Sequence, residues 1–162
     1  MDGIAKGIWP TMITPFGDDG GVDESAIGAM VDWYIQRGCD GIFAVCQSSE
    51  MFYLSLDERV RLARAVVRAA GGRIDVIASG HVSDGPDDQA AELRAISRTG
   101  VKAVVLISNR LAGEGEGDDV WIRNAERLTA ALPGAAFGLY ECPPPLQAAA
   151  GADGRPTWTT ST

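Results

Sequence analysis

The chain of 162 residues has the length of one ordinary domain, and 46% hydrophobic with 22% charged residues is typical of a folded globular protein. Its formal net charge of -8 opposes the phosphates of nucleic acids and of anionic membranes, so neither is an expected partner. No apolar run approaches the ~20 residues of a membrane-spanning helix, and no basic stretch leads into an apolar segment at the N-terminus. We therefore expect a cytoplasmic protein.

The cysteines and the histidine argue against a metal centre. Cys39, Cys46 and Cys142 are odd in number and form no CxxC pair, which is typical of reduced thiols. His81 is the only histidine, so a zinc site or a Ser–His–Asp triad has a single imidazole available. We expect no metal site, an inert Cys46 thiol, and a His81 that is solvated or hydrogen-bonded rather than directed at a substrate.

The first part of the chain predicts a strand, a loop and a helix. Residues 7–14 form a short apolar run that Pro15 and a cluster of glycine and aspartate residues close. Asp23 is a candidate helix N-cap, and the predicted helix ends at Gly38. Between them one apolar stripe recurs at helical spacing: Ile27, Met30, Val31, Tyr34 and Ile35.

The same unit then repeats along the chain. Ser55 and Glu58 form the pattern of a capping box at the start of the second helix, and the third ends near Gly100. Further strands are predicted over residues 41–45, 74–78, 103–107 and 135–139, and the later helices over 84–99 and 118–132. Strands that begin roughly 30 residues apart are typical of βαβ units.

Two folds satisfy this alternation of apolar strands and amphipathic helices. Five units complete a flavodoxin-like sheet with strand order 2-1-3-4-5, which suits a non-catalytic binding or signalling module. The same units also form five of the eight repeats of a (β/α)₈ barrel, with the strands in sequential order. Periodicity alone does not separate the two. Residues 146–162 are small and polar without a period, which predicts disorder.

The segments at the predicted carboxyl ends of the strands carry a family resemblance. Ile13-Thr14-Pro15-Phe16, Cys46-Gln47-Ser48-Ser49-Glu50 and Leu139-Tyr140-Glu141-Cys142-Pro143, with a helix start at Leu54-Ser55-Leu56-Asp57-Glu58-Arg59, resemble the dihydrodipicolinate synthase and N-acetylneuraminate lyase family over about residues 5–144. The resemblance implies an α/β fold: residues 1–145 as the first five β/α units of a TIM barrel. We hypothesise that residues 146–162 are an out-of-frame tail.

The family's chemistry implies a lyase or aldolase acting on pyruvate or another 2-oxo acid. Such enzymes form a lysine Schiff base, need no metal or organic cofactor, and assemble as homotetramers. The resemblance places Tyr140 where the family's proton-shuttling tyrosine stands. Position alone is equally consistent with an ordinary tyrosine at a strand end, with its ring in the core and its hydroxyl in water.

The loop after the second predicted strand supplies the expected substrate-binding residues, Gln47, Ser48 and Ser49. The family's loop commonly reads Gly-Thr-Thr-Gly-Glu and holds the carboxylate of the 2-oxo acid. Ser48 keeps a hydroxyl at the carboxylate-binding position, whereas Gln47 replaces the hydroxyl that relays a proton to the tyrosine. The alternative is that Ser48 and Ser49 only cap a turn before the next helix.

Three departures from the family limit the expected activity. Ser108 stands where many members have a tyrosine that reaches the neighbouring subunit's site. No arginine follows Tyr140 to receive an aldehyde substrate's carboxylate, which argues against lysine biosynthesis. The resemblance places the Schiff-base lysine one β/α unit after Tyr140, whereas Lys6 and Lys102 lie at or before strand starts. We expect a chain truncated before the lysine, inactive alone, and prone to oligomerise through its open edges.

Overall fold

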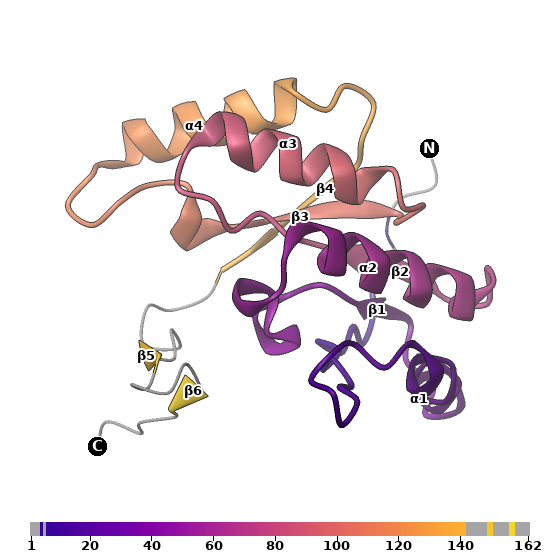
Figure 1. The fold of residues 1–162 in the computed structure, drawn as a ribbon. Coiled ribbons are helices and arrows are strands. Elements are labelled where there is room, and N and C mark those ends of the chain that lie inside the picture. The colour runs from indigo at the N-terminus through magenta and orange to yellow at the C-terminus, as the bar shows by residue number, and fades with distance from the viewer. Residues whose placement is uncertain (1–3, 5, 142–148, 151–155, 158–162) are drawn as a thin grey trace, which may run out of the picture.

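The computed structural model describes residues 4, 6–141, 149–150 and 156–157, and it contains the predicted alternation of strands and helices (Figure 1). The four main helices are α1 (Glu24–Gln36), α2 (Leu56–Ala70), α3 (Pro86–Ser97) and α4 (Asp118–Ala130). The main strands are β1 (Gly41–Phe43), β2 (Asp75–Ala78), β3 (Ala103–Ile107) and β4 (Phe137–Tyr140). Three short 3₁₀ helices follow strand ends: η1 (Gln47–Ser49), η2 (Met51–Tyr53) and η3 (Ser108–Arg110).

The four strands form one parallel sheet in the sequential order β1-β2-β3-β4. The apolar run of residues 7–14, the opening run, lies along the free edge of β1. There Thr11 and Phe43 form a parallel bridge. The Met12 amide donates to the Phe43 carbonyl at 2.9 Å, and the Phe43 amide donates to the Pro10 carbonyl at 3.0 Å. The run makes this bridge rather than a full strand, and Pro10 has no N–H with which to extend a ladder.

This order decides between the two predicted folds. A flavodoxin-like sheet places the opening strand between the second and the third. Here β1 pairs directly with β2, with Gly41 opposite Asp75, and the opening run lies outside β1. The sequential order of a barrel is confirmed, and the flavodoxin-like alternative is wrong for the residues that the structure describes.

The predicted helix starts at Asp23 and Ser55 are confirmed. Asp23 accepts hydrogen bonds from the amides of Ser25 at 2.9 Å and Ala26 at 3.3 Å. The Ser55 hydroxyl accepts from the Glu58 amide at 3.3 Å, while the Glu58 carboxylate accepts from the Ser55 amide at 2.8 Å. These side chains satisfy amides that the first turn of a helix leaves unpaired.

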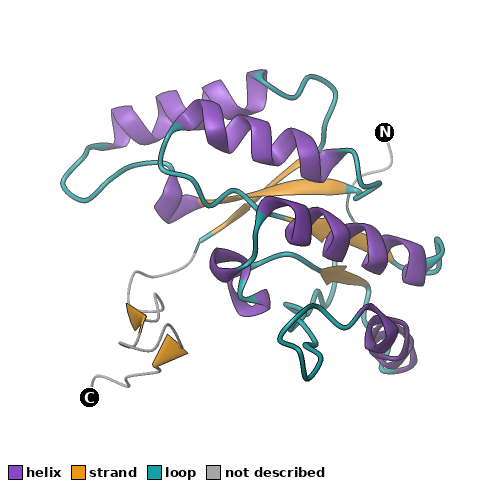
Figure 2. Ribbon diagram, in the orientation of Figure 1, coloured by secondary structure: helices purple, strands orange, loops and turns teal. Residues whose placement is uncertain are grey.

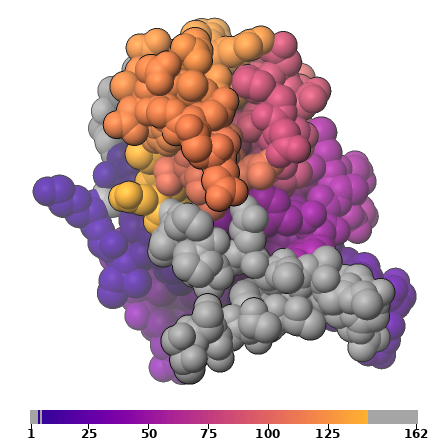
Figure 3. All heavy atoms as spheres, turned by 90° about the vertical axis from the view of Figure 1, so that its left-hand side faces the viewer, coloured from indigo at the N-terminus to yellow at the C-terminus, as the bar shows by residue number. Residues whose placement is uncertain are grey.

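Helices α2, α3 and α4 cover one face of the sheet, as the two ribbon views show (Figures 1 and 2). An ion pair of 2.6 Å between Arg127 and Asp87 joins α4 to α3, and the atoms of these helices form one continuous layer at the top of Figure 3. The core lies between helices and sheet, and its largest fully buried apolar side chains include Ile27, Ile42, Leu62, Leu93, Ile96, Ile107 and Leu128.

The sheet curls strongly. The rings of Phe43 on β1 and Tyr140 on β4 meet edge to face, with centroids 5.6 Å apart. Two strands lie between β1 and β4, so a flat sheet would separate these residues by three strand spacings, or about 14 Å. The ring contact therefore indicates the curvature of a barrel wall.

Apolar side chains are exposed at both lateral edges of this wall. Ile8 and Ile13 on the opening run are 67% and 61% exposed, and Leu139 on β4 is 56% exposed. Within the described residues β4 pairs only with β3. Both edges are thus available for further packing.

Most of the predicted tail lies outside the described residues. Where the structure does describe it, two short strands, β5 (Ala149–Ala150) and β6 (Pro156–Thr157), pair antiparallel. In the part of the chain that is described, no helix is long and apolar enough to cross a membrane.

A close approach at Gly41 fixes the opening run to the sheet. The Trp9 ring passes so near the Gly41 backbone that a Cβ atom there would lie 2.0 Å from a ring carbon. The neighbouring Asp40 carboxylate accepts from the Ile8 amide at 2.8 Å. Only glycine leaves room for the ring at this place.

We predict that Gly41→Ala lowers the free energy of unfolding by about 1–3 kcal/mol, because the Trp9 ring must move away from β1. Gly28→Ala is the matched control: it lies within α1, where an added Cβ meets no atom within 4 Å, and should stabilise by up to about 1 kcal/mol. Urea unfolding followed by tryptophan fluorescence measures both. Equal effects at the two glycines would contradict the assigned packing.

Candidate functional site

The loop after β1 begins the candidate site. Cys46 has an extended backbone, Gln47 to Ser49 form the 3₁₀ turn η1, and Glu50 follows in the left-handed region with φ 58°. Glu50 is the only non-glycine residue with positive φ in the described chain. Such a conformation costs energy and persists where the surroundings hold it in place.

The Ser49 side chain holds this turn from inside. Its hydroxyl oxygen lies 2.5 Å from the Met12 carbonyl oxygen, also contacts the Ala44 carbonyl, and accepts from the Cys46 amide at 3.1 Å. Thr14 adds a second tether, because its hydroxyl donates to the Ser49 carbonyl at 2.7 Å. The turn is thereby attached to the ends of both the opening run and β1.

The three predicted substrate-binding residues therefore differ in their access to a ligand. Ser48 is exposed and Gln47 is partly exposed, whereas Ser49 is 1% exposed and its hydroxyl is directed into the protein. Both Gln47 and Ser48 stand at the carboxyl end of β1, the end of a parallel sheet where ligands bind.

Tyr140 is the last residue of β4 and lies at the same end of the sheet. It pairs in register with Ile107, the last residue of β3, and it is partly exposed. Its ring contact with Phe43 brings the end of β4 toward the end of β1, from which the loop of Ser48 continues. The curl of the sheet thus gathers the predicted tyrosine and the predicted carboxylate-binding loop at one rim.

His81, which follows β2, is fully buried and has both ring nitrogens engaged. Nε2 accepts from the Ile107 amide at 2.8 Å, and Nδ1 lies 2.9 Å from the Gln89 side-chain oxygen. Because Nε2 is the acceptor, Nδ1 carries the proton and donates to Gln89. Burial lowers the pKa of His81 to about 4. His81 is thus a neutral support for the end of β3: it is hydrogen-bonded, as expected, and it is not solvated.

A buried ion pair fixes the loop that contains His81. Arg59 from α2 and Glu92 from α3 lie 3.1 Å apart and are 4% and 6% exposed. Arg59 donates to the Gly80 carbonyl, and the Glu92 carboxylate accepts from the amides of Val82 at 2.8 Å and Ser83 at 3.2 Å. Every charge in this cluster therefore has a hydrogen-bonded partner, as a buried pair requires.

Arg110 strengthens the same loop from η3. Its guanidinium donates to the Val82 carbonyl and to the Asp84 carboxylate at 2.8 Å, and it lies over the Phe52 ring at 5.8 Å. The Ser108 carbonyl accepts from the Trp121 indole at 3.0 Å. These contacts join η3 to the loop after β2 and to helix α4.

Cys46 and the lysines are not placed for nucleophilic chemistry. Cys46 is 1% exposed, and burial raises the pKa of its thiol, so the reactive thiolate is disfavoured. Lys102 precedes β3 and pairs with Asp75 at 3.8 Å, at the amino ends of the strands, and Lys6 precedes the opening run. Among the described residues, no cluster of His, Cys, Asp and Glu side chains is suited to a metal ion.

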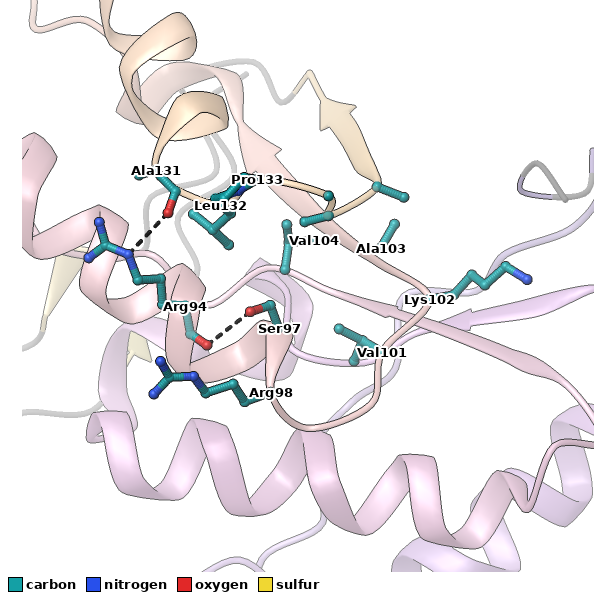
Figure 4. A pocket seen from close by; sticks show the side chains of 13 residues that line it. Arg94, Ser97, Arg98, Val101, Lys102, Ala103, Val104, Ala131, Leu132 and Pro133 are labelled. Atoms are coloured by element: carbon teal, nitrogen blue, oxygen red, sulfur yellow. Dashed lines mark hydrogen bonds between the residues drawn. The ribbon is translucent and has the colours of Figure 1, made fainter. Parts of the chain in front are cut away.

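A cavity of about 500 Å³ lies at the opposite end of the sheet, between the ends of α3 and α4 and the start of β3 (Figure 4). Arg94 on its rim donates to the Ala131 carbonyl at 3.1 Å. Figure 4 shows Lys102 directed away from Arg94 and Arg98, so these cations do not converge on one point. Residues at this end of a barrel serve stability rather than chemistry.

A sequence model of the dihydrodipicolinate synthetase family matches residues 4–108 of the chain. The chain belongs to this family. A 4-hydroxy-tetrahydrodipicolinate synthase of Thiobacillus denitrificans is 40% identical over 74 residues, which are 46% of this chain and 25% of that protein. An N-acetylneuraminate lyase of Rhizobium meliloti is 41% identical over 73 residues, which are 45% of this chain and 24% of the relative.

Solved structures of family members have the same fold. A dihydrodipicolinate synthase of Bacillus anthracis superposes with a TM-score of 0.75 at 25% identity, covering 85% of this chain and 46% of that one. The synthase of Acinetobacter baumannii, solved in complex with pyruvate, gives a TM-score of 0.76 at 24% identity, with 85% and 46% covered. The chain thus spans less than half the length of these relatives, and its fold is that of part of the family's TIM barrel.

Several residues that shape this rim were not among the site residues predicted from sequence. Thr14 and Gln89 are polar residues at positions whose contacts come from distant parts of the chain. Arg59 and Glu92 are buried charges on helix faces that carry mostly apolar residues. On each of two neighbouring helices, a charged residue stands at a position where the apolar stripe would continue. This pattern could have indicated the buried ion pair from the sequence.

We predict that His81 makes the chain less stable as pH falls from about 6.5 toward 4. The unfolded chain binds a proton near pH 6.5, whereas the folded chain does so only near 4, so folding is disfavoured between these values. From pH 7 to 4.5 the loss attributable to this residue is about 2 kcal/mol. Urea unfolding at both pH values measures it.

His81→Asn is the control, since it removes the titrating group while the carboxylates remain. The variant should be less stable at pH 7 because the Ile107 amide loses its acceptor. Its stability should nevertheless fall less between pH 7 and 4.5 than that of the unsubstituted chain. The same fall in both chains would show that His81 does not titrate as assigned.

Proposed function

We propose that this chain supplies the substrate-binding loop and the proton-transferring tyrosine of a lyase that acts on pyruvate or another 2-oxo acid through a lysine Schiff base. The contact between Phe43 and Tyr140 carries the proposal, because it joins the ends of β1 and β4 at one rim. Family membership supports the class of reaction. The pyruvate complex of the Acinetobacter baumannii relative supports the class of substrate.

The proposed chemistry assigns separate tasks to the two parts of the rim. The hydroxyl of Ser48 donates to the carboxylate of the 2-oxo acid, with Gln47 beside it. In the complete reaction a lysine amine attacks the ketone carbon and water leaves, so that the resulting iminium accepts the electron pair of the carbon–carbon bond that breaks. The Tyr140 hydroxyl transfers the proton that these steps require.

The proposal includes a limit on what this chain does alone. Lys102 lies at the amino ends of the strands and Lys6 precedes the opening run, so neither is placed to form an imine at the rim. We therefore propose that the chain by itself is inactive. The carboxamide of Gln47 has no readily titrated proton, so Tyr140 exchanges protons with water or substrate rather than through residue 47.

Assembly is part of the same proposal. Ile8, Ile13 and Leu139 expose apolar surface at the two edges of the curled sheet, and covering such surface favours association. A homo-oligomer accords with this exposure.

We predict that sodium borohydride with pyruvate leaves this chain unlabelled. Borohydride reduces an imine to a stable amine, which adds the mass of the reduced pyruvyl group to the lysine that formed it. Intact-mass spectrometry measures the adduct, and a pyruvate-handling lyase of the family with its Schiff-base lysine serves as the positive control. Labelling of Lys6 or Lys102 would contradict the proposal that neither reaches the rim.

We predict in addition that pyruvate binds non-covalently at the loop after β1 and that Ser48→Ala raises its Kd about tenfold, the usual effect of losing a hydrogen bond to a charged group. Amide chemical shifts during a pyruvate titration measure Kd and locate the site. Lactate, which lacks the ketone, tests whether the carboxylate dominates recognition. A Kd unchanged by Ser48→Ala would remove Ser48 from the proposed site.

A further inference from the structure

We infer that Ser49 is a positioning residue: it fixes the turn of residues 46–50 so that the neighbouring Ser48 faces the 2-oxo acid. The inference rests on the proposed function and deepens it, because it gives the two adjacent serines different roles. Ser48 contacts the ligand, and Ser49 acts only through Ser48.

The Ser49 hydroxyl is already engaged by backbone groups of the protein. One oxygen atom contacts the carbonyls of Met12 and Ala44 and accepts from the Cys46 amide. A hydroxyl has one proton and two lone pairs, so this environment uses its donor and an acceptor site. A ligand could reach this oxygen only by displacing its buried backbone partners. Leaving such groups without a hydrogen bond costs free energy.

The backbone partners of the Ser49 hydroxyl come from three different segments of the chain. Met12 belongs to the opening run, Ala44 follows β1, and Cys46 begins the turn itself. Ser49 thus joins the ends of two neighbouring extended segments to the turn that follows the second. Because the side chain is 1% exposed, water does not compete for these contacts.

A second hydrogen bond from the opening run holds the backbone of Ser49. The Thr14 hydroxyl donates to the Ser49 carbonyl at 2.7 Å, and Thr14 is 7% exposed. Side chain and backbone of Ser49 are therefore both held by the opening run. With residue 49 fixed through side chain and backbone and Glu50 in the left-handed region, the backbone that carries the exposed Ser48 is held in place.

A double-mutant cycle separates positioning from direct contact. We expect Ser49→Ala to weaken pyruvate binding about tenfold, and the Ser48→Ala, Ser49→Ala double variant to lose no more than about tenfold in total. Two independent ligand contacts would instead multiply to about a hundredfold. Amide chemical shifts in a pyruvate titration of the full chain give each Kd.

Hydrogen exchange supplies the structural readout of the same variants. The Cys46 amide should exchange at least about tenfold faster in Ser49→Ala, because it loses its acceptor, and at the unsubstituted rate in Ser48→Ala. If Ser49→Ala does not fold, Thr14→Val removes the second tether and keeps the hydroxyl of Ser49. Its loss of binding should likewise vanish when Ser48 is already alanine.

The outcomes are distinct. Additive losses in the cycle, or an unchanged Kd in Ser49→Ala, would overturn the positioning role and leave the proposed function standing. Failure of the unsubstituted chain to bind pyruvate would overturn the proposed function and the inference with it. A non-additive cycle together with faster exchange at Cys46 supports the inference.

Discussion

The contact between the rings of Phe43 and Tyr140 is the constraint on which the arrangement of the site depends. It closes a distance that a flat sheet would leave open, and it does so between the first and last strands of the main sheet. Parallel strands bring their carboxyl ends to one edge, but only curvature makes that edge a rim around a shared space. The curvature thus brings Tyr140 at the end of β4 toward the end of β1, from which the loop of Ser48 continues.

Rigid supports surround this rim on the side of the helices. Glu92 and Arg110 engage backbone groups of the loop after β2, and His81 in that loop accepts from the Ile107 amide at the end of β3. Ser49 and Thr14 hold the loop after β1. Most of these groups are buried and hydrogen-bonded, so they fix backbone positions without offering reactive atoms. At the same rim Ser48 is exposed and Gln47 is partly exposed.

The sequence allowed the fold to be predicted well because its signals are local. The N-cap at Asp23 and the capping box at Ser55 depend on residues within one helical turn, and both formed as expected. The opening strand was reduced to a bridge, and the proline within it is the local reason. The choice between barrel and flavodoxin-like order was not local, since it depends on which strands pair, and only the family resemblance pointed to it. The role of the Ser49 hydroxyl was also hidden, because its partner at Met12 lies 37 residues away.

The buried pair of Arg59 and Glu92 has a consequence for how this protein can change over time. Loss of either partner alone strands a charge in the interior, which typically costs about 3–5 kcal/mol. Replacement of both residues by apolar ones would be compatible with the packing. It would, however, leave the Gly80 carbonyl and the amides of Val82 and Ser83 without their side-chain partners. A change at position 59 of α2 is therefore constrained by position 92 of α3, and the reverse also holds, although the two residues lie 33 positions apart in the sequence.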